Sequence, residues 1–205
     1  MQSYLIPAAS AVAEIAVKQS RFICSVAPVT SSVEHQQHIH ACQQQWPNAS
    51  HYCHAAICAA PSASSSYVMS DDGEPSGTAG RPMLTVLLNS GLGEVSVVVT
   101  RYFGGTKLGT GGLQRAYTQA TLVGLEATEK IEKKVRKSAY LHYDYADQNV
   151  VSHWLAQYDA IIEQQDFGAT ISQRVALPEA QFPDLAAALK NATQGRVTLA
   201  KTSGD

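Results

Sequence analysis

The chain has 205 residues, a formal net charge of −2 and an apolar content of 45%. This length suffices for one large domain or two small ones, and the near-neutral charge excludes a global basic field that would draw the whole chain to nucleic acid. No apolar run reaches the roughly 20 residues of a membrane-spanning helix, and the N-terminus lacks the basic and apolar segments of a signal peptide. We therefore expect a cytoplasmic protein without membrane partners.

The first third of the chain predicts strands around one helix. Two strands are expected within residues 11–30, a helix over Ser32–Trp46 and a strand over 51–59, followed by a loop over 61–67. The helix has apolar side chains at helical spacing and stops before Pro47. Its three histidines are expected at the surface or at the edge of the apolar stripe: His35, His38 and His40.

The four cysteines form no C-x-x-C motif, so we expect free thiols packed as small apolar groups: Cys24, Cys42, Cys53 and Cys58. The stretch HYCHAAIC, residues 51–58, suggests a metal site by its composition. A strand would place His51 and Cys53 on one face and the other His and Cys on the opposite face, whereas zinc needs about four converging ligands. We predict no metal there.

Ten of the 14 glycines lie between Gly73 and Gly112, the strongest compositional bias in the chain. Within this region a short helix is expected over RPMLTVLLNSG, because proline suits its first turn and glycine its end. The β-branched run EVSVVVTRYF (94–103) predicts a buried strand, and a second helix is expected from about Thr110.

The composition changes at EKIEKKVRK (129–137), where five of nine residues are basic. We place the boundary of two domains here, 1–132 and 137–205. The stretch is either the solvated end of a helix followed by a linker or a local anion-binding patch.

The rest of the chain alternates in the order β-α-β-β-α-β. Strands are expected at 139–145, 160–167, 169–177 and 196–200, and helices around 150–155 and 182–189. This order predicts a ferredoxin-like domain.

The stretch RYFGGTKLGTGGLQRAY (101–117) has the composition of an anion site. Backbone N–H groups of glycine-rich turns and a helix N-terminus both favour phosphate, and three cations flank them: Arg101, Lys107 and Arg115. Neither the Walker A pattern nor the Rossmann pattern fits, since Thr110 and Gly111 stand in the Lys and Ser/Thr places and Gln114 in the last Gly place. The alternative is that the glycines permit tight turns and close helix–strand packing.

A second glycine-rich stretch, SDDGEPSGTAGRPML (70–84), carries the carboxylates Asp71, Asp72 and Glu74. Three carboxylates suit Mg²⁺ beside a phosphate, but the EF-hand spacing is absent, and Asp-Gly and Pro-Ser-Gly also serve plain turns. We expect no bound metal and no other cofactor.

These two stretches together resemble the YigZ/IMPACT family, and the N-terminal SRFIC and the second-domain pattern fit its bacterial branch, so the resemblance covers almost the whole chain. It implies an α+β protein with an N-terminal ribosomal-protein-S5 domain 2-like domain and a C-terminal ferredoxin-like domain similar to those of ribosomal translocation factors. Eukaryotic relatives regulate translation under stress through an additional N-terminal interaction domain. No such domain precedes the motifs here, so we do not expect that pathway.

The resemblance and the residues together predict a cytoplasmic regulatory protein, more a binding protein than an enzyme, that contacts RNA or the ribosome. The cations and glycines would hold phosphate, with Tyr102 or Phe103 for base stacking, and the predicted contact residues are Arg101, Tyr102, Gly104, Gly105, Lys107, Gly109, Gly111, Gly112 and Arg115. The accompanying motif loop comprises Asp71, Asp72, Gly73, Glu74, Gly77, Thr78, Gly80 and Arg81. Two alternatives stay open: a Mg²⁺-dependent enzyme acting on a nucleotide or phosphorylated metabolite, and a module that binds a protein partner.

Overall fold

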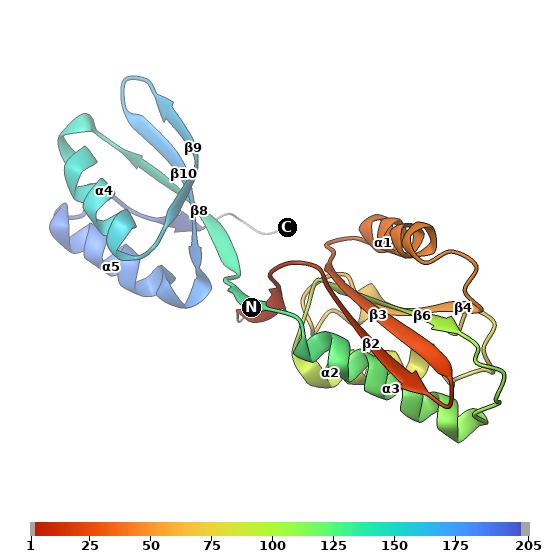
Figure 1. The fold of residues 1–205 in the computed structure, drawn as a ribbon. Helices are drawn as coiled ribbons and strands as arrows, with labels where there is room; N and C mark the ends of the chain where they lie inside the picture. Colours follow the sequence, from red (N-terminus) through yellow and green to blue (C-terminus); the bar gives the residue numbers. More distant parts are fainter. Residues whose placement is uncertain (1–2, 202–205) are drawn as a thin grey trace. The chain divides into compact units, whose positions relative to one another are not determined.

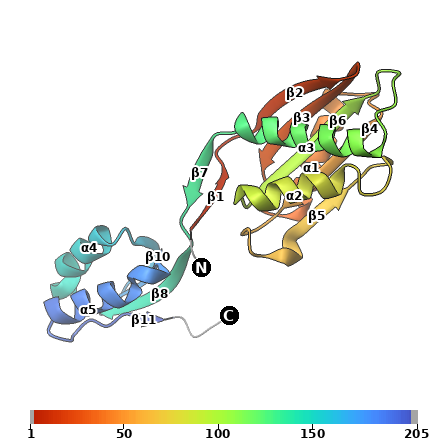
Figure 2. The same ribbon diagram turned by 90° about the horizontal axis from the view of Figure 1, so that it is seen from below.

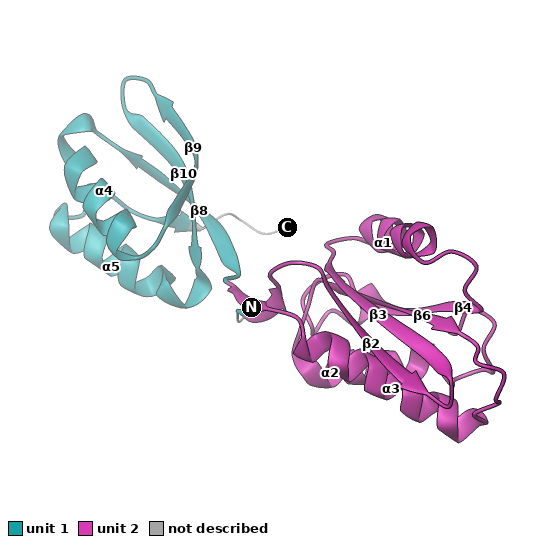
Figure 3. Cartoon of the chain, in the orientation of Figure 1, with its two compact units in different colours: residues 1–3, 134–205 teal, residues 4–133 magenta. Residues whose placement is uncertain are grey.

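The computed structural model describes residues 3–201 and separates the chain into two compact units (Figures 1 and 3). One unit comprises residues 4–133, and the other comprises residues 134–201 together with Ser3. The division lies inside the basic stretch 129–137. The α+β class and the two-domain organisation predicted from the sequence are confirmed. None of the helices in the described part of the chain has the length and apolar character to span a bilayer.

The N-terminal unit is built on a five-stranded antiparallel sheet with the strand order β2-β3-β6-β4-β5. Its strands are β2 (Ala11–Val17), β3 (Ser20–Pro28), β4 (His51–Ile57), β5 (Tyr67–Ser70) and β6 (Val95–Tyr102). Three helices pack on it: α1 (Ser32–Gln45) on one face, and α2 (Gly80–Ser90) and α3 (Thr110–Glu126) on the other (Figure 1). The expected loop at 61–67 contains a 3₁₀ turn, η1 (Ser64–Ser66), and Tyr67 already belongs to the edge strand β5.

The central strand β6 explains why this domain has helices on both faces of its sheet. Val97 and Val99 pack into the main core beneath α2 and α3, whereas Val98 packs with Ile39 and Cys42 of α1. A strand buried on both sides reads as a continuous apolar run rather than as an alternating one. The four cysteines are free and buried, as expected.

The C-terminal unit has the expected βαββαβ order. Its elements are β8 (Arg136–Tyr143), α4 (Gln148–Gln157), β9 (Ile161–Phe167), β10 (Ile171–Pro178), α5 (Phe182–Ala192) and β11 (Ala200–Lys201), with 3₁₀ turns η2 (Tyr145–Asp147) and η3 (Glu179–Gln181). The strands form an antiparallel sheet in the order β11-β8-β10-β9, whose one face is covered by α4 and α5 (Figure 1). The last strand begins at Ala200 instead of residue 196.

The basic stretch 129–137 is neither a helix end nor a free anion patch. Helix α3 ends at Glu126, and β7 (Lys130–Lys133) pairs with β1 (Tyr4–Pro7), a short strand that the sequence pattern did not reveal. Four of the five cations of the stretch face carboxylates: Lys133 lies 2.5 Å from Glu94, Lys134 and Arg136 lie 2.9 and 2.7 Å from Asp159, and Lys137 pairs with Glu179.

Helix α1 is anchored by a chain of hydrogen bonds rather than by apolar contacts alone. The chain runs from Ser25 to His38 (2.9 Å), through the hydroxyl of Ser96 (2.7 Å to each flanking ring), to His35 and on to His54 (2.9 Å). His35 is fully buried, so the expectation of a surface or stripe-edge position is wrong for this histidine. Burial lowers the pKa of His38 to about 4, and burial followed by the rings of His54 and His38 lowers the pKa of His35 to about 4.

We expect these histidines to make the protein sensitive to acid. Between pH about 6.5, the ordinary histidine value, and pH about 4, the unfolded chain binds more protons than the folded chain, so stability falls as the pH falls. Chemical unfolding of the wild type, His35→Gln and His40→Gln at pH 7 and pH 5 measures this. The pH dependence should be smaller for His35→Gln and unchanged for His40→Gln, whose histidine is exposed on the same helix. Equal pH dependence in all three proteins would contradict this account.

Two glycines of α3 should respond oppositely to alanine. A Cβ added at Gly124 would lie 2.3 Å from Cys24 Sγ and 3.2 Å from Val26, whereas one at Gly111 would meet only Arg115 Nη1, at 3.7 Å. Gly124→Ala should therefore lower the free energy of unfolding by about 1–3 kcal/mol through overpacking. Gly111→Ala should leave it unchanged or raise it by up to about 1 kcal/mol through helix propensity. Urea unfolding measures both, and a tolerated Gly124→Ala would show that α3 packs less closely on β3.

Candidate phosphate-binding site at the glycine-rich loops

The two glycine-rich stretches meet at one end of the N-terminal domain. The motif loop (residues 71–79) precedes α2, and the glycine loop (residues 103–109) joins β6 to α3. Helices α2 and α3 lie side by side and run in the same direction, so that their N-termini share this end (Figure 2). The side-chain amide of Gln114, in the first turns of α3, reaches the carbonyl of Gly77 at 3.4 Å. The fold therefore brings the motif loop and the glycine loop, both predicted from the sequence, to the same end of the domain.

Asp71 caps the N-terminus of α2. Its Oδ1 accepts the N–H groups of Ala79 and Gly80 at 2.9 Å, and its Oδ2 accepts that of Gly77 at 2.8 Å. Partial burial opposes ionisation, but these three donors hold the pKa of Asp71 below its ordinary value. The positive end of α2 is thus compensated by a carboxylate of the chain itself.

The other two carboxylates of the motif loop are also engaged. Asp72 Oδ2 accepts the backbone N–H of Tyr52 at 2.6 Å, and Glu74 Oε1 accepts Arg101 Nη1 at 2.5 Å and the hydroxyl of Tyr117 at 2.8 Å. Within residues 3–201, no group of three or more His, Cys, Asp or Glu side chains is arranged to hold a metal ion. The geometry assigns these carboxylates to capping and ion pairing.

Arg101 is part of a buried network and not of the surface. Its side chain is 6% exposed, that of Glu74 is 3% exposed, and the guanidinium lies 5.4 Å from the ring of Phe22 and 5.6 Å from that of Phe103. Cys53 Sγ donates to the Tyr117 hydroxyl at 3.2 Å, and burial raises the pKa of both groups. Arg101, which the sequence analysis expected to bind phosphate, is therefore the buried ion-pair partner of Glu74.

The two aromatic residues of the glycine loop differ in availability. The hydroxyl of Tyr102 donates to the carbonyl of Pro47 at 3.0 Å, and Arg21 covers its ring at 5.6 Å. Phe103 is 48% exposed, with one face over Arg101. Of the two stacking candidates, Phe103 is the one that presents its ring to solvent.

Three of the five glycines in the stretch 101–117 have clear conformational roles. A Cβ on Gly104 would lie 2.1 Å from the backbone of Gln19, and Gly105 and Gly109 have φ angles of +85° and +72°. Close approach and turns therefore account for these positions. Gly111 and Gly112 lie in the first turn of α3, where Gly111 leaves the backbone exposed.

The N-terminus of α3 differs from that of α2 because no carboxylate of the described residues caps it. Gly109 offers no side-chain cap, and the first turn contains no acidic residue. Lys107 and Arg115 are exposed, and among the described residues no carboxylate lies within 4 Å of either. The guanidinium of Arg115 lies over Gly111, and it shares a pocket of about 300 Å³ with Lys18 of the β2–β3 turn. Lys18 was missed in the sequence because no local pattern places that turn beside α3.

The fold and this pair of glycine loops define a two-domain α+β protein, and comparisons with known proteins place it in a family. Residues 18–125 match the Impact N-terminal domain, and residues 141–196 match a domain of unknown function, DUF1949. The chain belongs to the IMPACT family.

Three curated relatives and one solved structure illustrate the likeness. The IMPACT family member YigZ of Escherichia coli K12 is 37% identical over 97% of this chain and 98% of its own length, and an IMPACT family member of Haemophilus influenzae is 37% identical over 97% of both. YvyE of Bacillus subtilis is 38% identical over 75% of this chain and 67% of its own. A solved structure described as a hypothetical protein covers both chains completely, with 36% identity and a TM-score of 0.74.

Removal of Arg101 should destabilise the domain strongly, because Glu74 would stay buried without its partner. We expect Arg101→Ala to lower the free energy of unfolding by about 3–5 kcal/mol. Arg21→Ala is a matched control on the neighbouring strand: its partner Glu14 lies 2.7 Å away, but both side chains are about half exposed, so the loss should be much smaller than for Arg101→Ala. Urea unfolding measures both variants, and similar losses would show that burial adds nothing to the Arg101 pair.

Proposed function

We propose that this protein is a cytoplasmic regulatory protein linked to translation that binds RNA, free or in the ribosome, through a phosphate contact at the N-terminus of α3. The contact comprises the exposed residues Thr110 and Gly111 and the side chains of Lys18, Lys107 and Arg115. Phe103 supplies an exposed ring beside it for base stacking.

A single observation carries this proposal: cations gather at the uncapped positive end of a helix. The N-terminus of a helix repels positive side chains and attracts anions. Here Arg115 lies over the first turn and Lys107 just precedes it, without a carboxylate within ion-pairing distance in the described part of the chain. An anion at this position would offset charge that the protein leaves uncompensated. Phosphate fits because a helix N-terminus and neighbouring cations both attract it.

Membership in the IMPACT family supports the link to regulation of translation, which the resemblance implies for its eukaryotic members. The motif loop supports a binding protein over a Mg²⁺-dependent enzyme, because Asp71, Asp72 and Glu74 already accept hydrogen bonds from the protein. We therefore favour the binding function.

Fluorescence anisotropy with labelled single-stranded and duplex RNA over a salt series tests the proposal. Lys107→Ala and Arg115→Ala should each weaken binding similarly for all sequences, and for single strands each should reduce the slope of log K against log salt by about 0.7. Lys190→Ala, which removes an exposed lysine from α5 in the other domain, is the matched control and should change neither quantity.

The result that would overturn the proposal is a lack of RNA binding even at about 50 mM salt, or binding that the two variants leave intact. ATP with Mg²⁺ is measured in parallel. Saturable, Mg²⁺-dependent ATP binding without RNA binding would replace the proposal by the enzyme alternative.

A further inference from the structure

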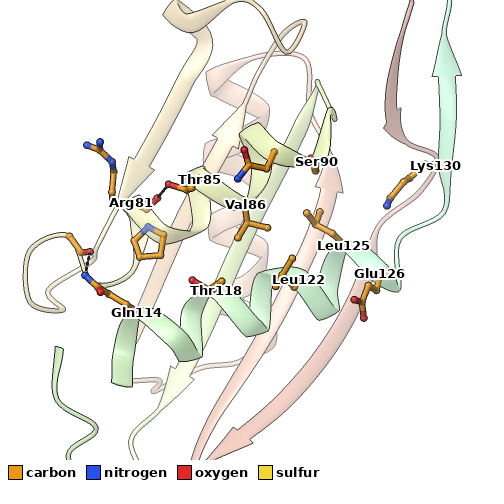
Figure 4. A pocket seen from close by; sticks show the side chains of 13 residues that line it. Arg81, Thr85, Val86, Ser90, Gln114, Thr118, Leu122, Leu125, Glu126 and Lys130 are labelled. Carbon is orange, nitrogen blue, oxygen red and sulfur yellow. Dashed lines mark hydrogen bonds between the residues drawn. The ribbon is translucent and has the colours of Figure 1, made fainter. Parts of the chain in front are cut away.

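A groove of about 690 Å³ runs between α2 and α3 and is open to solvent (Figure 4). Pro82 and Val86 of α2 and Leu122 and Leu125 of α3 supply its apolar surface. Leu122, in the middle of this apolar surface, is 41% exposed. Polar residues also line the groove, with Thr85 and Thr118 between the two ends.

Charge is distributed unevenly along this groove. Arg81 lies at the end where the two helices begin, and Lys130 and Glu126 lie at the opposite end (Figure 4). Neither cation has a carboxylate within 4 Å among the residues that the structure describes. Within the described part of the chain, each end of the groove therefore carries a cation without an ion-pair partner, Glu126 is the one carboxylate of the lining, and the middle carries no charge.

The length of the groove sets the size of its occupant. On α3 it extends from Gln114 to Glu126, twelve residues apart in sequence, which corresponds to about 18 Å at 1.5 Å per residue. The same length holds about three turns of another α-helix. Two neighbouring helices present the ridges between which a third helix packs.

We propose that this groove binds an amphipathic helix of a partner protein, with apolar residues at i, i+3 or i+4, and i+7, and with acidic residues near both ends. The apolar residues would cover Leu122 and Val86, and the acids would pair with Arg81 and Lys130. Because α2 and α3 present their positive ends together, the dipoles favour a partner helix that runs antiparallel to them.

This binding site is separate from the proposed RNA contact. The groove uses Arg81 and Lys130, whereas the RNA contact uses Lys18, Lys107 and Arg115. Each proposal therefore has its own variants, and the failure of one leaves the other standing.

A phage-displayed library of random 16-residue peptides provides the probe. Selection on the full-length wild-type protein should enrich helical sequences with the stated apolar spacing and acidic flanks. Their affinity should fall about tenfold or more for Leu122→Glu. Leu88→Glu should change it less than about twofold. This control is closely matched, because Leu88 is a leucine of α2 that is 43% exposed and does not line the groove.

A charge-reversed protein adds a second measurement that does not depend on the leucine. Selection on Arg81→Glu/Lys130→Glu should enrich basic flanks in place of acidic ones. Unfolding curves check that each variant folds, which the exposure of the three side chains favours. No enrichment, enriched peptides without the helical spacing, or equal loss in Leu88→Glu and Leu122→Glu would overturn the proposal. So would self-association of the protein that Leu122→Glu abolishes, since a second copy would then be the occupant.

Discussion

The buried carboxylate of Glu74 links the motif loop to strand β6 and helix α3 of the N-terminal domain. It accepts hydrogen bonds from Arg101 at the end of β6 and from Tyr117 in α3, and Tyr117 in turn accepts one from Cys53 in β4. A buried carboxylate is costly to desolvate unless it is paired and hydrogen-bonded, so the motif loop has one favourable position, against β6 and α3. Glycine at 73 and 77 allows the loop the positive φ angles that this position requires.

Because Glu74 pairs with Arg101, it is not available to pair with the cations of the glycine loop and α3. The Glu74 carboxylate accepts a hydrogen bond from the Arg101 guanidinium. Asp71 accepts hydrogen bonds from the backbone N–H groups at the start of α2. Helix α3, by contrast, begins without a cap and next to Lys107 and Arg115. The unpaired positive charge at this end is thus a consequence of where the acidic residues are used, and not of the net charge, which is −2.

Long, uninterrupted patterns made much of the fold predictable. The β-branched run at 94–103 and the helix from Thr110 were found because their signals span several turns or residues and need no distant partner. The sequence analysis did not predict strands β1 and β7, because each has only four residues and their pairing joins positions about 125 apart in the chain. The burial of Arg101 was not predicted for the same reason: its partner Glu74 is distant in sequence, and without that partner an arginine at a strand end is expected to be exposed.

The parallel arrangement of α2 and α3 gives this helix pair two surfaces with different chemistry. At the N-terminal end of α3, the first turn has no side-chain cap and cations are exposed beside it, which suits the proposed phosphate contact, while along the side of the helix pair the exposed Leu122 and its apolar neighbours suit the proposed partner helix. A rigid support is needed for both, because an anion site loses affinity when its donors move and a groove loses its shape when its helices separate. That support comes from the sheet, where α2 packs on β4 and β5 and α3 packs on β2 and β3, over one core that includes Val97 and Val99 of β6. Gly104 lets the chain pass close to Gln19, and Gly124 lets α3 pack close to Cys24 of β3. These two glycines therefore support both surfaces indirectly, because they help to fix the position of α3.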